Sequence, residues 1–168
     1  MSSEAKEMTM SQQGTTHVIG VHHVGLSARD PAALAAFYHD VLGLQVVGGS
    51  TADASAFGAT AFLSSHPDEE SHDLAIFANP AFQHTAFKVQ SLADLRAVYQ
   101  RVLGRGVPVK MAFNHIVSIA FYFEDPEGHL IEVYWPTGVD WHQPYGDPID
   151  LTLSEEEIQR QVRELAAR

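Results

Sequence analysis

The chain has 168 residues, 45% of them hydrophobic and 18% charged, which is typical of one soluble globular domain with its own core. Its net charge of −11 argues against nucleic acid and anionic membranes as partners, because phosphate binding needs clustered Lys and Arg. With no cysteine, the chain forms neither disulfides nor thiolate metal sites. No apolar run approaches the ~20 residues that span a bilayer and no signal peptide is visible, so we expect a cytoplasmic protein.

The predicted elements fall into two modules of the same order within one domain. Residues 1–16 are polar and are expected to be a disordered tail, and the domain covers 17–150. The modules span 17–80 and 83–136, and an irregular aromatic extension follows the second one. Residues 151–168 are expected to form a C-terminal helix.

The first module reads as one strand, one helix and three further strands. Asp30 is the expected N-cap of the helix, Pro31 occupies its first position, and Gly43 ends it. The spacing of apolar residues predicts one buried helical face, formed by Leu34, Phe37, Tyr38, Val41 and Leu42. Apolar runs separated by turn residues predict the strands, at His17–Ser27, Leu44–Val47, Ala56–Leu63 and Leu74–Phe77.

The second module repeats this order. Ser91 is the expected cap of its helix, whose apolar face is formed by Leu92, Leu95, Tyr99, Val102 and Leu103. Its strands are predicted at His84–Val89, Val107–Phe113, Val117–Phe123 and His129–Trp135. Ser154 and Glu157 form a capping box for the last helix, whose apolar stripe is Ile158, Val162 and Leu165.

Each module leaves one face of its four-stranded sheet without a helix. Two such modules most simply meet through these open faces. The predicted fold class is therefore α+β, with two βαβββ modules forming a half-open mixed β-barrel around a cleft.

The two modules also share a sequence repeat. HVGLSARDPAALAAFYHDVLG begins at His23, and HTAFKVQSLADLRAVYQRVLG begins at His84, 61 positions later. Strand alternation puts His23 on the same side as the small Gly25, with the bulkier Val24 and Leu26 on the other side under the helices. The repeat therefore places two histidines at equivalent positions on the open face, among small neighbours that leave room for a metal ion and a ligand.

A hairpin is predicted to bring a carboxylate to the same face. The turn Asp125–Gly128 fits a type I turn followed by a left-handed glycine, in which Asp125 pairs with His129. In this register Tyr122 directly opposes Glu132, so a phenol and a carboxylate lie side by side.

His23, His84 and Glu132 would form a set of two histidines and one carboxylate. This set is typical of non-haem Fe(II) oxygenases, where it leaves positions open for substrate and dioxygen. Fe(II) is the expected metal, and Mn(II) is the alternative because identical ligands accept either. Taken singly, each residue is more often structural than ligating, but the symmetry-related strands favour the metal site.

These motifs resemble the vicinal oxygen chelate superfamily, also called the glyoxalase, bleomycin-resistance and dioxygenase fold. The resemblance runs from about Val18 to Trp135 and is closest to single-domain type I extradiol ring-cleavage dioxygenases. In HHVGL, HTAFKV and FYFEDPEGHLIEVYW, the residues His23, His84 and Glu132 match the family's metal ligands. The resemblance implies Fe(II)-dependent cleavage of a catechol-type aromatic diol by dioxygen, as part of aromatic catabolism.

Three further residues match the dioxygenases. His72, in SHDLAIF, matches their catalytic acid–base histidine, and Tyr122 matches the tyrosine that hydrogen-bonds the bound substrate or oxygen. His115, in NHIVSIAFY, matches a histidine seven residues before that tyrosine. The resemblance implies that His72 transfers protons while Tyr122 and His115 steer the reaction. The alternatives are a solvated loop histidine at His72 and a core aromatic at Tyr122.

Three other functions stay open for the same fold. A glyoxalase-like lyase or isomerase usually has a fourth ligand, a glutamate on the last strand of the first module. Ile76 falls near that position, with Glu69, Glu70 and Asp73 close by. A fosfomycin-modifying transferase resembles sequences with Thr two residues after the first histidine, where this chain has Gly25. A non-enzymatic, bleomycin-resistance-like drug-binding protein would not need the three ligands.

The expected partners are a small aromatic diol and dioxygen. Loops such as Gly48–Phe57 and Trp141–Tyr145 are expected to form the pocket walls, and their aromatic residues favour a flat organic ligand. We also expect a homodimer or a higher homo-oligomer.

Overall fold

The computed structural model describes residues 18–51, 56–68 and 71–168. The predicted tail over 1–16 lies outside these residues, as do the first residue of the first predicted strand and the acidic pair Glu69 and Glu70. Within the described ranges, no helix has the length and apolarity needed to cross a lipid bilayer.

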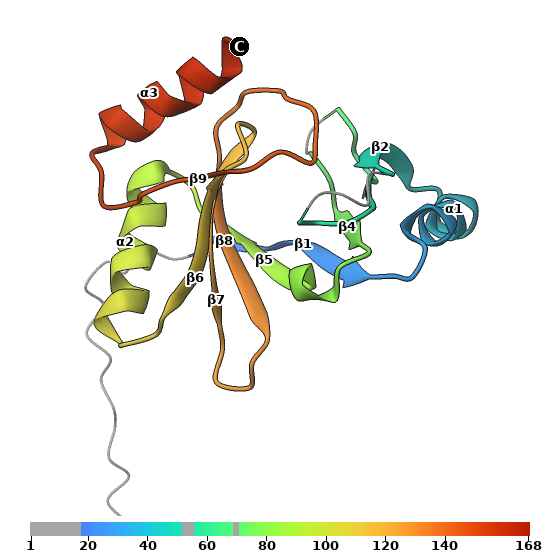
Figure 1. Cartoon of the computed structure of the whole chain (residues 1–168), viewed down its shortest axis with the longest axis horizontal. Helices are drawn as coiled ribbons and strands as arrows, with labels where there is room; N and C mark the ends of the chain where they lie inside the picture. The colour runs from blue at the N-terminus through green and yellow to red at the C-terminus, as the bar shows by residue number, and fades with distance from the viewer. Residues whose placement is uncertain (1–17, 52–55, 69–70) are drawn as a thin grey trace, which may run out of the picture.

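In the described ranges, nine strands form one mixed sheet, in the order β2-β3-β4-β1-β5-β8-β7-β6-β9. The first module contributes β1 (Gly20–Ser27), β2 (Gln45–Ser50), β3 (Thr60–Ser64) and β4 (Leu74–Phe77). The second contributes β5 (His84–Lys88), β6 (Val109–Asn114), β7 (Ser118–Glu124) and β8 (Leu130–Pro136), and the extension after it contributes β9 (Asp147–Pro148). The antiparallel pair β1–β5 joins the modules, and β1–β4 and β5–β8 are both parallel. Figure 1 shows the sheet curling between the helices, which confirms the predicted half-open α+β barrel.

The α-helices of the described part of the chain follow the predicted order, at α1 (Pro31–Leu42), α2 (Leu92–Gly104) and α3 (Glu155–Ala166). The side chains of Asp30, Ser91 and Ser154 accept hydrogen bonds from the backbone N–H three residues further on, as N-caps do. Gly43 ends α1 with a φ of 74°, in the left-handed region that glycine adopts without strain. All three predicted caps are confirmed.

The buried face of α1 differs from the prediction. Pro31 and Ala35 are buried, and Leu34 and Tyr38 pack against the same cluster on β3 and β4. These four residues form one stripe at the spacing i, i+3, i+4, i+7. The other predicted residues lie on a neighbouring stripe and are exposed, at Phe37 (55%), Val41 (59%) and Leu42 (62%).

The helices of the second module share one core cluster. On α2 the predicted Leu92, Leu95 and Val102 are buried, whereas Leu103 is 40% exposed. Ile158 and Val162 of α3 belong to the same cluster, so the C-terminal helix packs on its own chain. In Figure 1 this helix lies beyond the end of α2.

Within the described residues, the helices cover mainly the two outer parts of the sheet. Helix α1 contacts β2, β3 and β4, and α2 contacts β7 and β8. Leu26 and Phe87 pack against the two clusters as predicted. Val24 was expected under a helix but is 37% exposed, because it lies between the two helices on β1.

The β7–β8 hairpin has the predicted loop. The Asp125 N–H donates to the His129 carbonyl at 3.0 Å, and the Gly128 N–H donates to the Asp125 carbonyl at 2.9 Å. Gly128 has a φ of 85°, as the predicted left-handed position requires. The resulting register pairs Tyr122 with Glu132.

Residues 137–146 lead from β8 to β9, and we call this segment the strap. It arches over one end of the half-barrel in Figure 1. A Cβ added at Gly48 of β2 would lie 3.7 Å from the Gln143 carbonyl oxygen. The strap thus lies against β2, the edge strand of the first module. In this position it closes part of the open side of the barrel.

Candidate metal centre and cavity

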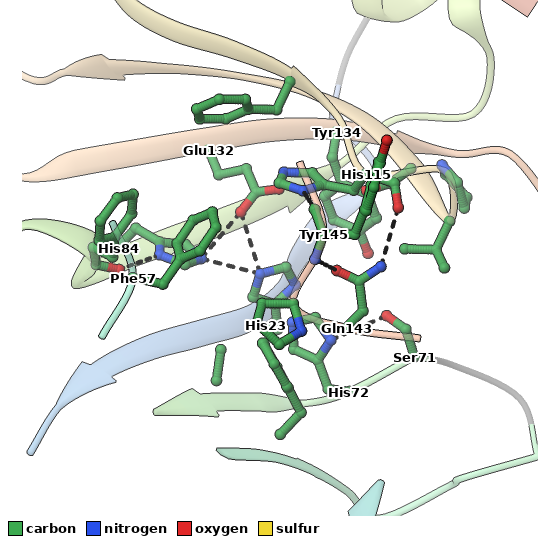
Figure 2. A pocket seen from close by; sticks show the side chains of 18 of the residues that line it. His23, Phe57, Ser71, His72, His84, His115, Glu132, Tyr134, Gln143 and Tyr145 are labelled. Atoms are coloured by element: carbon green, nitrogen blue, oxygen red, sulfur yellow. Dashed lines mark hydrogen bonds and ion pairs between the residues drawn. The ribbon is translucent and has the colours of Figure 1, made fainter. Parts of the chain in front are cut away.

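Three buried side chains converge at the centre of the sheet. His23, His84 and Glu132 come from the adjacent strands β1, β5 and β8. The two Nε2 atoms are 3.1 Å apart, and Glu132 Oε2 lies 3.3 Å from that of His23 and 3.0 Å from that of His84. Figure 2 shows the three groups pointing toward one another. The residues predicted from the repeat therefore share one focus and could hold a metal ion.

The backbone before β5 sets the orientation of His84. Its Nδ1–H donates to the Phe82 carbonyl at 2.6 Å, which directs Nε2 toward His23 and Glu132. Phe82 belongs to a short 3-10 turn, Pro80–Phe82, ahead of the strand. A Cβ at Gly25 would lie 2.5 Å from His84 Nδ1 and 3.0 Å from the Phe82 carbonyl. The glycine two residues after His23 therefore makes room for the second imidazole.

The charge on Glu132 is held by its two neighbours. Burial acts to raise the pKa of Glu132, but hydrogen bonds and positive charge from His23 and His84 hold it well below its usual range. Burial lowers the pKa of His23, whereas for His84 the effect of burial is outweighed by Glu132 and the pKa is raised. A buried carboxylate of this kind needs a compensating cation.

The donor set fits a divalent metal ion. Ligand bonds of about 2.1 Å at right angles place donor atoms about 3.0 Å apart. The separations of 3.0, 3.1 and 3.3 Å between the three donors are of this size. Two imidazoles and one carboxylate are the usual facial ligands of Fe(II), and they also accept Mn(II).

His72 lies against the first of these ligands. Its ring centroid is 4.4 Å from that of His23 and 5.0 Å from that of Phe62, and Ser71 Oγ is 3.1 Å from its Nδ1. Burial, followed by the nearby His23, lowers the pKa of His72 well below its usual 6.5. The structure thus places a neutral, half-buried imidazole in the lining of the cavity beside the triad, on the loop that precedes β4.

His115 and Tyr122 form a hydrogen-bonded pair on the other side. The His115 Nδ1–H donates to the Tyr145 carbonyl at 2.5 Å, so Nε2 accepts from the Tyr122 hydroxyl at 3.2 Å. Burial, followed by the charge of Glu132, raises the pKa of Tyr122 well above 10. Burial also lowers the pKa of His115. Both groups are therefore neutral, and Tyr122 lies beside Glu132.

Sequence reasoning missed the residue that holds this pair in place. Gln143 Nε2 donates to the His115 carbonyl at 3.0 Å, and its Oε1 accepts from the Tyr145 N–H at 3.1 Å. One side chain thus bridges both partners of the His115–Tyr145 hydrogen bond, as Figure 2 shows. The only signal in the sequence was the prediction that Trp141–Tyr145 forms a wall of the cavity, which the structure confirms for Gln143 and Tyr145.

The strand register corrects one prediction about the first module. Gly25 pairs with Ala75 in β1–β4, and Ala86 pairs with Glu132 in β5–β8. Gly25 and Ala86 each lie two residues after the histidine of their module, so Ala75 is the equivalent of Glu132. The placement of Ile76 at this position was wrong by one residue, and Ile76 instead packs in the core below α1.

A second pair of equivalent residues follows from the same register. Phe62 lies opposite Ala75 in β3–β4, as Tyr122 lies opposite Glu132 in β7–β8. Asp73, the other acidic residue near this position within the described ranges, accepts two hydrogen bonds of 2.5 Å from Ser65 instead. Where the second module carries a phenol and a carboxylate, the first module therefore carries a phenyl ring and a methyl group.

The triad opens onto a cavity of about 480 Å³. Residues before β5 line it with four phenyl rings and some polar side chains, at Phe57, Phe62, Phe77, Phe82, Asp68, Ser71 and His72. Residues after β5 line it with polar side chains and some apolar ones, at His115, Ser118, Tyr122, Tyr145, Phe113, Val117 and Val139. His72 and all three members of the triad also line this cavity, so a ligand inside it would reach both the metal position and the three predicted catalytic residues.

Comparisons with known proteins agree with this architecture. The family model of the Glyoxalase/Bleomycin resistance protein/Dioxygenase superfamily matches residues 20–133. Biphenyl-2,3-diol 1,2-dioxygenase 3 of Rhodococcus globerulus is 29% identical over 123 residues, which are 66% of this chain and 60% of that protein. Metallothiol transferase FosB of Shouchella clausii is 28% identical over 125 residues, 71% of this chain and 82% of that protein. The chain thus spans less than two thirds of the length of the dioxygenase.

Solved structures share the fold at low identity. The 2,3-dioxygenase LapB from Pseudomonas sp. KL28 superimposes with a TM-score of 0.61 at 19% identity, over 80% of this chain and 47% of that one. A Mn(II)-bound glyoxalase from Novosphingobium aromaticivorans gives a TM-score of 0.58 at 24% identity, over 76% and 42%. Since the family match covers more than half of its residues, the chain belongs to the glyoxalase/bleomycin resistance protein/dioxygenase superfamily.

Proposed function

We propose that the protein is an Fe(II)-dependent extradiol dioxygenase, which cleaves the ring of a catechol-type diol with dioxygen beside the two hydroxyl groups. The observation that carries this proposal is the arrangement of His72, Tyr122 and His115 around a triad that opens onto a cavity. A drug-binding protein needs no such arrangement, and a glyoxalase-like lyase usually has a fourth protein ligand.

His23, His84 and Glu132 would hold the metal ion. When bound there, Fe(II) supplies the positive charge that favours loss of a catechol hydroxyl proton and the redox chemistry that a reaction with dioxygen needs. Their burial lowers the local dielectric, which strengthens the electrostatic attraction between the carboxylate and the cation.

His72 would act as the general acid–base. A neutral imidazole can take a proton from a substrate hydroxyl and return it to an oxygen atom at a later step. The lowered pKa of His72, caused first by burial, keeps the imidazole neutral and able to accept that proton at neutral pH. Its position against His23 brings it close to a ligand of the metal.

Tyr122 and His115 would orient the oxygen atoms of the substrate. The Tyr145 carbonyl fixes His115 in the tautomer that accepts from the Tyr122 hydroxyl. Tyr122 is thereby held on the cavity side of Glu132, where its phenol oxygen can contact a diol that approaches the metal. The raised pKa of Tyr122 keeps the proton on its phenol. Because this proton is donated to His115, the phenol oxygen is left to accept a hydrogen bond from a substrate hydroxyl.

Two alternatives lose support at particular residues. A glyoxalase-like lyase with four protein ligands would need a carboxylate at Ala75, the equivalent of Glu132, and alanine provides none. The transferase alternative resembles sequences with Thr two residues after the first histidine. At Gly25 even a Cβ would come within 2.5 Å of His84 Nδ1, so a threonine is incompatible with the observed position of this ligand.

The test is anaerobic reconstitution with Fe(II), followed by catechol or 2,3-dihydroxybiphenyl and then air. Uptake of dioxygen with formation of a yellow ring-opened product is the expected result. Turnover of glutathione hemithioacetals without uptake of dioxygen would select the lyase instead. The same assay with Mn(II) decides which metal supports turnover. A homo-oligomer and a cytoplasmic location stay predictions from the sequence.

A further inference from the structure

We infer that the cavity selects neutral aromatic diols that carry an apolar substituent or a second ring, and that it rejects diols with a carboxylate substituent. This inference rests on the proposed ring-cleavage function and names its substrate class. It is carried by three observations on the described residues, which concern the aromatic wall, the charge of the cavity and the volume.

The aromatic wall is a packed cluster next to the metal position. The Phe57 and Phe82 rings lie 4.8 Å apart, and Phe77 lies 5.8 Å from Phe82 and 6.1 Å from Phe62. Phe77 is also 5.9 Å from the ring of His84. A diol held near the triad would therefore have the phenyl rings beside it, where an apolar substituent gains burial and edge or offset stacking.

The register explains why this side of the cavity is apolar. Ala75 and Phe62 occupy the positions of Glu132 and Tyr122 in the repeated module. The duplication thus places a phenyl ring and a methyl group where the other module has a phenol and a carboxylate. Phe62 joins Phe57, Phe77 and Phe82 in the aromatic wall, against which the part of the substrate that does not react would lie.

The charges that line the cavity are acidic. Asp68 and Asp140 are both exposed at its edge, and none of the described lining residues is Lys or Arg. The sequence has no Lys or Arg between Arg29 and Lys88, nor between Lys110 and Arg160. A substituent carboxylate would therefore lack an ion-pair partner and would meet like charges, which disfavours binding.

The volume leaves room for more than one ring. A cavity of roughly 150 Å³ is enough to hold a single benzene molecule. The cavity here measures about 480 Å³. An unsubstituted catechol would leave much of it to water, whereas a biaryl diol or an alkylated catechol would cover the aromatic wall.

The discriminating experiment compares two catechols of nearly equal shape. 3-(3-Methylbutyl)catechol and 3-(2,3-dihydroxyphenyl)propanoate differ in that the second replaces the terminal isopropyl group by a carboxylate. We expect kcat/KM of the Fe(II)-loaded enzyme to favour the neutral compound by at least about 10-fold, as the charge argument requires. Dissociation constants measured without oxygen should show the same preference, since the effect acts on binding.

Two double variants with the same change in net charge test whether the acidic residues at the cavity edge set the selectivity. The double variant Asp68→Lys/Asp140→Lys should reduce the preference by at least about 10-fold, mainly through tighter binding of the propanoate. Glu127→Lys/Glu156→Lys changes the net charge equally but alters the hairpin tip and α3, so the preference should not change. An equal shift in both double variants would mean that net charge, not the cavity edge, sets the selectivity.

The outcomes separate this inference from the function on which it rests. Equal kcat/KM and equal binding of the two catechols would overturn the selectivity and leave ring cleavage intact. Failure to cleave either one, with the binding preference preserved, would overturn ring cleavage and support the cavity assignment. A preference that is unchanged in Asp68→Lys/Asp140→Lys would overturn the role of these two residues.

Discussion

Ala75 occupies in the first module the position that Glu132 occupies in the second. Ala75 pairs with Gly25 in the parallel strands β1 and β4, and Glu132 pairs with Ala86 in the parallel strands β5 and β8. Gly25 and Ala86 each lie two residues after the histidine of their module. The duplicated sheet thus offers two pairs of equivalent positions, of which His23, His84 and Glu132 could hold a metal ion and Ala75 carries only a methyl group. In the proposed metal site, this asymmetry would leave the side of Ala75 open.

Replacing Ala75 by glutamate tests this relationship. We expect the Ala75→Glu protein to bind divalent metal at least as tightly, because a fourth ligand is added, and to lose about 100-fold or more in ring-cleavage rate. Metal affinity by calorimetry and dioxygen uptake measure the two effects. Ala75→Gln is the control of equal size, and it should gain no affinity. Undiminished cleavage in Ala75→Glu would show that position 75 does not face the metal.

Replacing Gly25 by alanine tests whether the space beside His84 is needed for metal binding. In Gly25→Ala the new methyl group would displace the His84 ring, since the Cβ would lie 2.5 Å from its Nδ1. We expect metal affinity to fall at least about 10-fold, as expected when a ligand is displaced from its supporting hydrogen bond. Gly20→Ala on the same strand is the control, because a Cβ there meets nothing within 4 Å. Equal metal content in both variants would contradict the assignment.

The sequence predicted the parts of the fold that depend on local chemistry. Asp30, Ser91 and Ser154 have side chains that satisfy free backbone N–H groups at helix starts, so the caps could be read directly. The hairpin register followed from the turn Asp125–Gly128, whose glycine requires a left-handed conformation. These features need no knowledge of the rest of the chain.

The wrong predictions concern features that depend on tertiary packing, namely the buried face of α1 and the residue equivalent to Glu132. Phe37 and Val41 fit an apolar helical stripe, but the sheet lies against the neighbouring stripe centred on Ala35. Setting AIFANP against EVYWP, through their shared aromatic residue and proline, placed Ile76 near the equivalent of Glu132. The two segments differ by one residue in the spacing between these landmarks, so only the strand pairing identifies Ala75 as the equivalent.

The sequence predicted the residues of the metal site but not the residue that positions His115. His23, His84 and Glu132 could be found because the repeat and the hairpin fix their strands and faces. Gln143 could not, because its role depends on how the strap folds back to His115, and irregular segments carry little periodicity.

His72 should be needed for turnover but not for metal binding. We expect His72→Gln to keep its metal content and to lose about 10²- to 10⁴-fold in kcat, which is the usual contribution of general acid–base catalysis. Metal analysis and single-turnover kinetics on the same preparation measure both properties. Loss of metal from this variant would mean that His72 acts on the ligands instead.

Gln143 is expected to position His115 without touching the substrate. Gln143→Leu removes both hydrogen bonds to the backbone, so kcat should fall about 10-fold and the free energy of unfolding by about 1–3 kcal/mol. Tyr145→Phe is the matched control. It removes only the hydroxyl that donates to Asp147 at 3.0 Å and keeps the carbonyl that His115 uses. A loss of stability without any fall in kcat would restrict Gln143 to a structural role.

Metal binding should be measurable as added stability. An ion that binds only the folded chain stabilises it by about 2.7 kcal/mol at a concentration 100-fold above its Kd. For a chain of this length such a gain raises Tm by roughly 5–10 °C. Glu132→Gln should remove the rise with Fe(II) or Mn(II) under anaerobic conditions, because the amide carries no charge to attract the cation. Glu124→Gln is the control, since Glu124 pairs with Lys110 at 3.0 Å on the hairpin and should leave the rise unchanged. A metal-dependent rise that persists in Glu132→Gln would place the ion elsewhere, and the proposed chemistry would lose its basis.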